Sequence, residues 1–303
     1  MPAVEGPTLL LTLATYGGWL VVTKGYGRWP LAVLAPVGTL LLTLHSSLQH
    51  EMTHGHPTRW PLFNRLLASV PLSLWLPFPR YQQTHLVHHR DERLTDPIDD
   101  PESYYLTPEC VARLNPLSRG MLQIQRTLLG RVLLGPPWII GKFLRAEFRA
   151  VWRGEAGMRA VWLKHLVWCI PVVYWVRWIC GMPLWVYVLS MVIPSGAVTL
   201  IRSFAEHRAR PAVRARIAIV ENSWILGPLF LFNNLHALHH EKPSIPWYRY
   251  PARYRTERTR LIAENGGLVY NTYFDVARRF MFRPHDALQH PMGRVPANQA
   301  SSG

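Results

Sequence analysis

Long apolar blocks with almost no acidic side chains are the feature that most constrains the fold of this chain. The blocks cover residues 8–23, 29–48, 160–180 and 183–201. A helix needs about 20 apolar residues to cross a bilayer, and the first block is short unless tilt and its flanking residues help it. A soluble protein with a buried core is the weaker alternative, because four such blocks are hard to place in one. We therefore expect an all-α integral membrane protein with four transmembrane helices in two hairpins.

The third block is the least regular of the four. Lys164, His165 and Arg177 interrupt it. Lysine and arginine near a helix end can extend to the membrane surface, whereas His165 would have to face the protein interior. The chain also has 13 tryptophans, many at block edges, which is typical of an aromatic belt at a membrane interface.

The positive charge of the chain lies between the apolar blocks and beside its histidine motifs. The formal net charge is +15. No nucleic-acid-binding module accompanies it, so we exclude nucleic acid as a partner. Arg-rich loops that stay in the cytoplasm and face anionic membrane lipids explain the charge more simply. The cysteines, Cys110, Cys169 and Cys180, show no CxxC spacing and indicate neither a disulfide framework nor a thiolate metal site.

Two copies of a His-x-x-His-His motif carry the chemistry. They are His85-Leu-Val-His88-His89 and His236-Ala-Leu-His239-His240. Residues three and four apart lie on the same face of a helix, so the three imidazoles of each copy are expected to converge on one point. Imidazole is the usual nitrogen ligand of iron, copper and zinc. The motifs therefore predict metal binding.

A third element, His50-Glu-Met-Thr-His54, follows the second apolar block directly. Even numbers of predicted spans separate the three elements, so all of them are expected to face the cytoplasm, where they can meet. His207, just after the fourth block, is a further candidate. The predicted ligands are His50, His54, His85, His88, His89, His207, His236, His239 and His240.

Nine imidazoles are more than one metal ion can coordinate, whereas two ions would have four or five imidazole ligands each. The absence of cysteine ligands suits iron, copper or zinc, and iron is the ion that activates oxygen beside membranes. Two rivals stay open. His50, Glu51 and His54 match a zinc-hydrolase motif with Glu51 as general base, although this leaves both triads unexplained. A metal transporter would place its ligands inside the spans rather than just beyond them.

Residues beside the triads are candidates for supporting roles. An acidic patch follows the first triad and is either a solvated loop or a source of carboxylates that accept N–H bonds from ligand histidines. Its members are Asp91, Glu92, Asp96, Asp99, Asp100 and Glu102. Asn233 and Asn234 could each hold a metal-bound water or cap nearby backbone groups through a side-chain hydrogen bond. His45 and His56 are weaker ligand candidates, and His165, His285 and His290 are expected to be structural or surface residues.

The ordered motifs resemble those of the integral-membrane fatty acid desaturase and hydroxylase superfamily, whose three histidine boxes are HxxxH, HxxHH and HxxHH. The segment from Asn233 to Tyr248 also resembles the third-box region of bacterial members. The resemblance covers roughly residues 8–260. It implies four membrane helices with a cytosolic cap, a non-haem diiron centre, and His207 as an additional ligand.

The resemblance also implies the reaction class, which is O2-dependent removal of hydrogen from an aliphatic lipid chain. A fatty acid (acyl) desaturase is the main expectation. A hydroxylase, a carotenoid ketolase or hydroxylase and an oxidative decarboxylase use the same boxes. Electrons are expected from a separate protein of the ferredoxin, rubredoxin or cytochrome b5 type, docked on the basic face. The expected location is the bacterial inner membrane, with the active site on the cytoplasmic side and the substrate entering from the bilayer.

No linker divides the chain, so we expect a single domain over residues 1–284 and a polar, disordered tail over 285–303. Residues 61–79 are apolar but broken by proline and are expected to lie at the interface or re-enter the membrane. Residues 120–160 combine arginines with aliphatic residues, as in a helix on a membrane surface.

Overall fold

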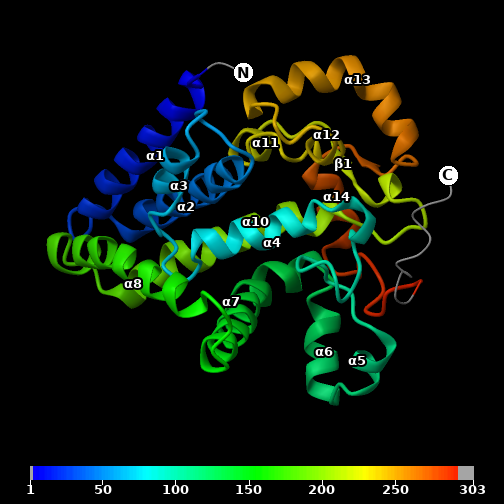
Figure 1. Ribbon diagram of the computed structural model, residues 1–303, viewed down its shortest axis with the longest axis horizontal. Helices are drawn as coiled ribbons and strands as arrows, with labels where there is room; N and C mark the ends of the chain where they lie inside the picture. Colours follow the sequence, from blue (N-terminus) through cyan, green and yellow to red (C-terminus); the bar gives the residue numbers. More distant parts are fainter. Residues whose placement is uncertain (1–2, 293–303) are drawn as a thin grey trace. The chain divides into compact units, whose positions relative to one another are not determined.

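Helices make up most of the protein, as the sequence predicts. The computed structural model describes residues 3–292 (Figure 1). Within that range, the named strands are the two-residue strands β1 (Ile219–Val220) and β2 (Val269–Tyr270), which pair in parallel. The chain divides into two compact units made of interleaved segments. The first unit contains Met1–Gln82, Gly135–Thr199 and Leu229–Leu231; the second contains Gln83–Leu134, Leu200–Pro228 and Phe232–Gly303.

The boundary between the units cuts through continuous helices rather than through a linker. The long helices α4 (Phe78–His88), α7 (Leu128–Trp152) and α10 (Ile193–Glu206) each contain residues of both units. The prediction that residues 1–284 form a single domain stays a prediction.

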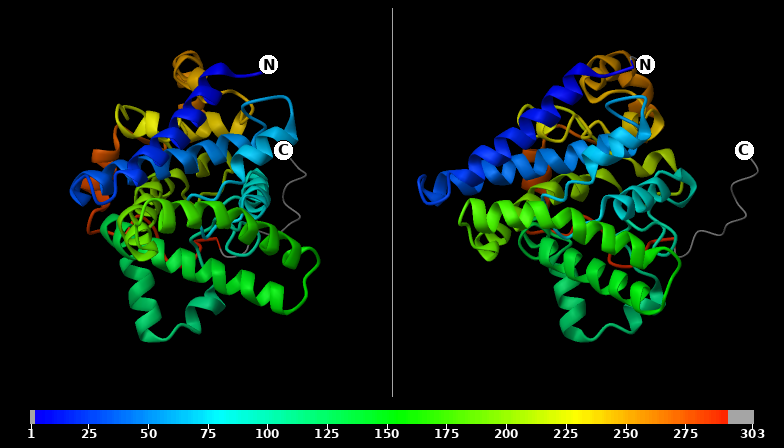
Figure 2. Two further views of the ribbon diagram at one scale, coloured as in Figure 1. Left: turned by 90° about the vertical axis from the view of Figure 1, so that its left-hand side faces the viewer. Right: turned by 60° about the vertical axis from the view of Figure 1, so that its left-hand side comes forward.

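The first unit begins with the helical hairpin that the first two apolar blocks predict. Helices α1 (Gly6–Lys24) and α2 (Leu31–Thr53) lie side by side (Figures 1 and 2). Gly25 lies at the turn, where a Cβ atom would come within 2.4 Å of the Trp29 ring. The close contact of Trp29 with the backbone therefore requires glycine at this position. Trp19 donates from Nε1 to the Tyr187 hydroxyl at 2.9 Å and so connects α1 to α9 (Leu184–Tyr187).

The third and fourth apolar blocks form further helices of the first unit. Helix α8 (Met158–Tyr174) continues into the π-helical turn η2 (Trp175–Ile179). Helix α9 (Leu184–Tyr187), the π-helical turn η3 (Val188–Val192) and α10 then follow one another directly. A Cβ atom on Gly38 of α2 would lie 2.4 Å from the Met191 sulfur, so a small residue is required where α2 meets η3.

Two helical segments are long and apolar enough to cross a membrane, Leu31–Thr53 and Leu184–Glu206. The first and third blocks are also helical, as α1 and α8, but neither is among these candidates in the described part of the chain. The four-span topology and the cytosolic cap therefore stay predictions. Residues 61–79 contain only the short helix α3 (Pro61–Ala68) before α4 begins, in agreement with the expected break.

The second unit is built around α12 (His236–Glu241), which packs against β1 and against α13 (Tyr250–Glu264). Ile219, Leu238 and Tyr250 are almost fully buried in its core. The remaining elements are η1 (Asp91–Arg93), α5 (Pro108–Ala112), α6 (Pro116–Ile124), η4 (Arg214–Arg216), α11 (Leu226–Leu229, of which Leu229 belongs to the first unit), η5 (Trp247–Arg249) and α14 (Tyr273–Phe280).

Residues 285–292, the start of the predicted tail, contact the second unit. The backbone N–H of His285 donates to the Arg126 carbonyl at 2.8 Å, and that of His290 donates to the Leu106 carbonyl at 3.0 Å. Both histidine side chains are buried. The rest of the predicted tail, residues 293–303, lies outside the described residues, and its disorder stays a prediction.

Candidate metal centre

Seven of the nine predicted ligands lie in the second unit, where they form two groups of imidazoles. The His207 group consists of His88, His207, His236 and His240, and the His89 group consists of His85, His89 and His239. Within each group, the candidate ligand nitrogens lie within 4.8 Å of one another.

Each triad is divided between the two groups, so the prediction that the three imidazoles of one copy converge on one point is wrong. His85 and His89 belong to one group and His88 to the other. The reason is helical geometry, because consecutive residues of an α-helix are rotated by about 100°. Residues four apart face almost the same way, whereas adjacent His88 and His89 face different directions. The second triad divides in the same manner, with His239 separated from His236 and His240.

In the His207 group, anchoring side chains fix the orientation of the outer rings. His88 donates from Nδ1 to the Asp100 carboxylate at 2.9 Å, because a carboxylate can only accept. His236 Nδ1 lies 3.1 Å from the Asn233 side-chain oxygen. When these two rings are neutral, their Nε2 atoms carry no hydrogen, and they lie 3.0 Å and 2.9 Å from His207 Nε2.

This arrangement fits a bound cation. Three Nε2 atoms face one another, and an N–H on His207 can donate to only one of the other two. The Nε2 lone pair of the remaining ring then faces His207 Nε2 with no hydrogen atom directed at it. Such an unsatisfied contact is energetically costly in a buried site. A metal ion at this point would accept the lone pairs of all three rings. The donor set of neutral imidazoles suits iron, copper or zinc.

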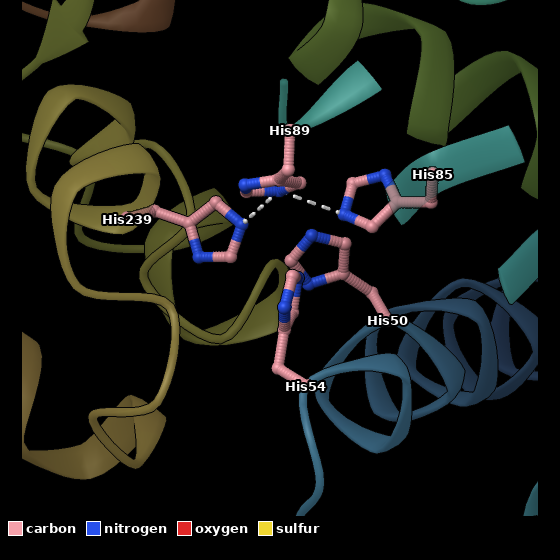
Figure 3. Close-up of side chains that lie close together, drawn as sticks. All are labelled: His50, His54, His85, His89 and His239. Atoms are coloured by element: carbon pink, nitrogen blue, oxygen red, sulfur yellow. Dashed lines mark hydrogen bonds between the residues drawn. The ribbon is translucent and has the colours of Figure 1, made fainter. Parts of the chain in front are cut away.

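The His89 group repeats the construction with different anchors. His85 Nδ1 lies 3.0 Å from a Glu102 oxygen, and His239 Nδ1 lies 3.2 Å from the Tyr250 hydroxyl. That hydroxyl donates to the Lys242 carbonyl at 3.1 Å, so its oxygen accepts from His239. The Nε2 atoms of His85 and His239 are directed at His89 Nε2, at 3.0 Å and 3.1 Å (Figure 3).

The two groups adjoin each other. The rings of His89 and His240, one from each group, stack with centroids 4.3 Å apart. Glu102 contacts both groups, since its second oxygen lies 3.9 Å from His88 Nε2. This proximity is what a two-metal centre requires.

The electrostatics of the His207 group place two neutral rings beside one ring, His88, where positive charge is favoured. Burial holds the pKa of His207 and His236 well below the usual range, which keeps both imidazoles in the ligating form. Burial also opposes the charging of His88, but the carboxylates of Glu102 and Asp100 outweigh it and raise the pKa of His88 to about 9. The carboxylates thus attract a cation to this position.

The first histidine element lies in the first unit, at the end of α2. His50 is in the last turn, His54 caps the helix, and their ring centroids are 5.1 Å apart (Figure 3). Buried Glu51 has a carboxylate oxygen 4.0 Å from His50 Nδ1. The assignment of His50 and His54 to the metal centre rests on the sequence and stays a prediction.

The weaker histidine candidates make other contacts. His45 Nε2 lies 3.2 Å from the Tyr16 hydroxyl, and His56 Nδ1 lies 2.6 Å from the Glu5 carboxylate. His165, His285 and His290 are buried and contact Leu74, Asp286 and Thr95, respectively, in agreement with the structural role expected for them.

The sequence identified some of the anchoring residues and missed others. The acidic patch supplies Asp100 and Glu102 as acceptors for ligand histidines, which confirms one of its two interpretations. Asn233 orients His236, a role that the sequence did not suggest, and Asn234 donates to the Val220 carbonyl at 2.6 Å. Tyr250 was missed altogether, because no spacing links it to the third box.

Comparison with known families agrees with the motifs. The model of the fatty acid desaturase family matches residues 27–274, which include the three histidine elements and His207. No individual curated protein matches the chain. Proteins of this family are generally membrane-bound diiron oxidoreductases. The match extends over most of the sequence, and the histidines it contains form the groups described above, so the chain belongs to the fatty acid desaturase family.

Proposed function

We propose that this protein is an O2-dependent oxidoreductase that removes hydrogen from an aliphatic lipid chain, and that it is an acyl desaturase. Its centre would hold two irons through the nine histidines of the three boxes and His207. The same ligands would also serve a hydroxylase, a carotenoid ketolase or an oxidative decarboxylase, and the shape of the substrate channel decides between these outcomes.

One observation carries the proposal: in each histidine group, the Nε2 atoms of the two outer rings face the central ring, while their anchored Nδ1 atoms face outward. Iron, when bound, supplies the redox chemistry that oxygen reduction and C–H cleavage require. The protein's own contribution is orientation. Asp100 and Asn233 hold the outer rings of one group, and Glu102 and Tyr250 hold those of the other, so the ligand atoms are in place before a metal binds.

The surroundings of the groups support a site that excludes bulk water. His88, His236 and His239 are each at most 2 % exposed. Burial strengthens the electrostatic interactions within the site and limits side reactions with solvent.

The membrane arrangement is part of the proposal. The two candidate spans support insertion into a bilayer. We propose four spans in two hairpins, a cap on the cytoplasmic side of a bacterial inner membrane, and a substrate chain that enters from the bilayer. A separate ferredoxin, rubredoxin or cytochrome b5 type protein would deliver electrons to the basic cytoplasmic face.

Metal content and products test the proposal together. The protein reconstituted with iron should hold about two irons per chain. The reduced protein should then consume O2 and convert an acyl chain to a product two mass units lighter for desaturation, or sixteen heavier for hydroxylation, by the composition of the groups lost or gained. Less than about one iron per chain would reject the diiron centre. One zinc per chain, with hydrolytic activity in the absence of O2, would support the Glu51 alternative instead.

A further inference from the structure

A pocket in the second unit adjoins the His207 group and contains two arginines that the metal centre does not use. Its lining includes His207, Glu206, Tyr104, Arg126 and Arg131. The pocket therefore joins a predicted metal ligand to a pair of cationic side chains.

Both guanidinium groups are buried. Arg126 and Arg131 are each only 6 % exposed. Arg126 donates from Nε to the Asp286 backbone carbonyl, and Arg131 donates from Nε to the Gln125 carbonyl at 2.9 Å. Neither forms an ion pair with a carboxylate in the described part of the chain. Charged groups in such surroundings ordinarily have an ionic partner, because an uncompensated buried charge is costly.

The carboxylates that line the same pocket already have partners. Asp100 accepts from His88, and Glu102 accepts from His85. Glu206 lies 3.2 Å from Arg202. Asp286 pairs with Arg208 at 3.0 Å and with His285 at 2.7 Å. Asp286 also attracts Arg126, although the two form no direct ion pair. Arg131 is therefore the cation whose charge has no carboxylate partner in the described part of the chain.

The geometry around Arg131 suits recognition of a planar or tetrahedral oxyanion. Its guanidinium carbon lies 3.7 Å from the centre of the Tyr104 ring, so the group stacks on a flat surface. Stacking leaves the N–H edge of a guanidinium available for paired hydrogen bonds to two oxygens. The Tyr104 hydroxyl and Ser203 Oγ are 3.1 Å apart, which brings further donors to the same lining. Burial lowers the pKa of Arg126 to about 10, while attraction from the nearby Asp286 carboxylate acts in the opposite direction and repulsion from Arg131 is a smaller cause.

We propose that Arg126 and Arg131 form an oxyanion-binding site for the carboxylate or phosphate head of a lipid chain, or for free phosphate. This inference deepens the proposed function, since it assigns the acidic head group of the substrate to this pocket. The binding site itself is independent of iron.

Ligand binding to metal-free protein tests the site without the oxidation chemistry. The full chain in nanodiscs is titrated with hexadecanoate, its uncharged methyl ester, hexadecyl phosphate and inorganic phosphate. We expect the charged probes to bind and to raise the melting temperature. The Arg131→Gln variant should weaken their binding by about tenfold or more, because a buried charge partner is removed. Arg255, which is exposed on α13, provides the matched control: Arg255→Gln should leave binding unchanged.

Two further variants keep the test decisive if Arg131→Gln does not fold. Arg126→Gln should also weaken binding, and Arg131→Lys should retain part of the affinity because it keeps the charge but loses the planar N–H edge. Stronger binding of hexadecanoate or hexadecyl phosphate than of inorganic phosphate identifies a lipid head group, and the reverse identifies free phosphate.

Equal binding of the acid and its ester, or unchanged binding in both the Arg131 and Arg126 variants, would overturn the proposal. Iron content, measured separately, should be the same in these variants as in the wild type. A failure of the diiron centre and a failure of the oxyanion site therefore give different results.

Discussion

The His207 group and the His89 group share one design but differ in what holds them. Each has a central imidazole and two outer rings whose Nε2 atoms face it at 2.9–3.1 Å. In the His207 group, the carboxylate anchor is Asp100, whose side chain is 2 % exposed. In the His89 group, it is Glu102, whose side chain is 36 % exposed.

The anchors also differ in how firmly they are fixed. Asp100 accepts hydrogen bonds from His88 and from the backbone N–H groups of Thr95 and Glu102, each at 2.9 Å. Glu102 reaches His85 from a partly exposed position on a longer side chain. A buried carboxylate with several donors loses less on binding a metal, since it is already ordered. We therefore expect the His207 group to hold its metal more tightly than the His89 group.

The largest effect should come from removing one ligand from either group. His88→Ala removes a ligand of the His207 group, and His239→Ala removes one of the His89 group. Each change should abolish oxidation of an acyl chain and reduce the iron content from about two to about one per chain. Metal analysis and product detection after reconstitution measure both effects. His290→Gln is the control, because His290 is buried outside both groups. Activity near that of the wild type in either alanine variant would remove that histidine from the centre.

The two carboxylate anchors give a direct test of the difference between the groups. Asp100→Asn replaces one acceptor oxygen by an amide that cannot accept, so either His88 or Thr95 loses its bond. Loss of such an anchor typically lowers metal affinity by about 10- to 100-fold. Glu102→Gln should lower metal affinity less, because solvent can partly replace the hydrogen bond of this partly exposed carboxylate. Competition with a chelator measures both affinities, and a larger loss in Glu102→Gln would reverse the proposed ranking of the groups.

The extent to which the fold follows from sequence differs between its parts. The hairpin of α1 and α2 was predictable, since two apolar blocks flank a short glycine-containing turn. The continuation of α2 to Thr53 was also predictable, because no helix-breaking residue separates the block from His50. The path of residues 200–235 was not, because it depends on the strand pair of Ile219 with Val269, which are fifty positions apart. Such pairing has no local signal.

The candidate site was predictable as a set of residues but not as an arrangement. The spacing of the triads identified the histidines, since ligand chemistry requires a particular residue type at fixed offsets. It did not show that His88 and His89 face different groups. Residues three and four apart both lie near one face of a helix, and this approximation does not reveal that the two directions point to separate groups. Tyr250 was not predictable, since its role depends on how α13 packs against α12. Contacts between separate elements are set by the tertiary fold.

Stepwise metal removal should reveal the unequal groups in the wild-type protein. A slow titration with a chelator should release iron in two phases if the anchors set the affinities, and the first phase should empty the His89 group. The Glu102→Gln variant identifies the phase, because it should shift the first release to lower chelator concentration by up to about tenfold and leave the second in place. A single phase, or a shift of the second phase alone, would contradict the comparison.

The smallest effect should come from Tyr250, the neutral anchor of the His89 group. Tyr250→Phe keeps the ring, which is 1 % exposed, and removes only the hydroxyl between His239 Nδ1 and the Lys242 carbonyl. The lost hydrogen bonds should lower the stability of the metal-free protein by about 1 kcal/mol, as measured by denaturant unfolding. Iron affinity should fall only a few-fold, because His239 keeps its position in α12 and loses only its preferred tautomer. If stability falls but the affinity and the first release phase do not change, Tyr250 supports the packing of α13 and does not orient His239. An affinity loss as large as that of Asp100→Asn would instead show that orientation of the ring, rather than the charge or burial of its anchor, controls how tightly each group holds its metal.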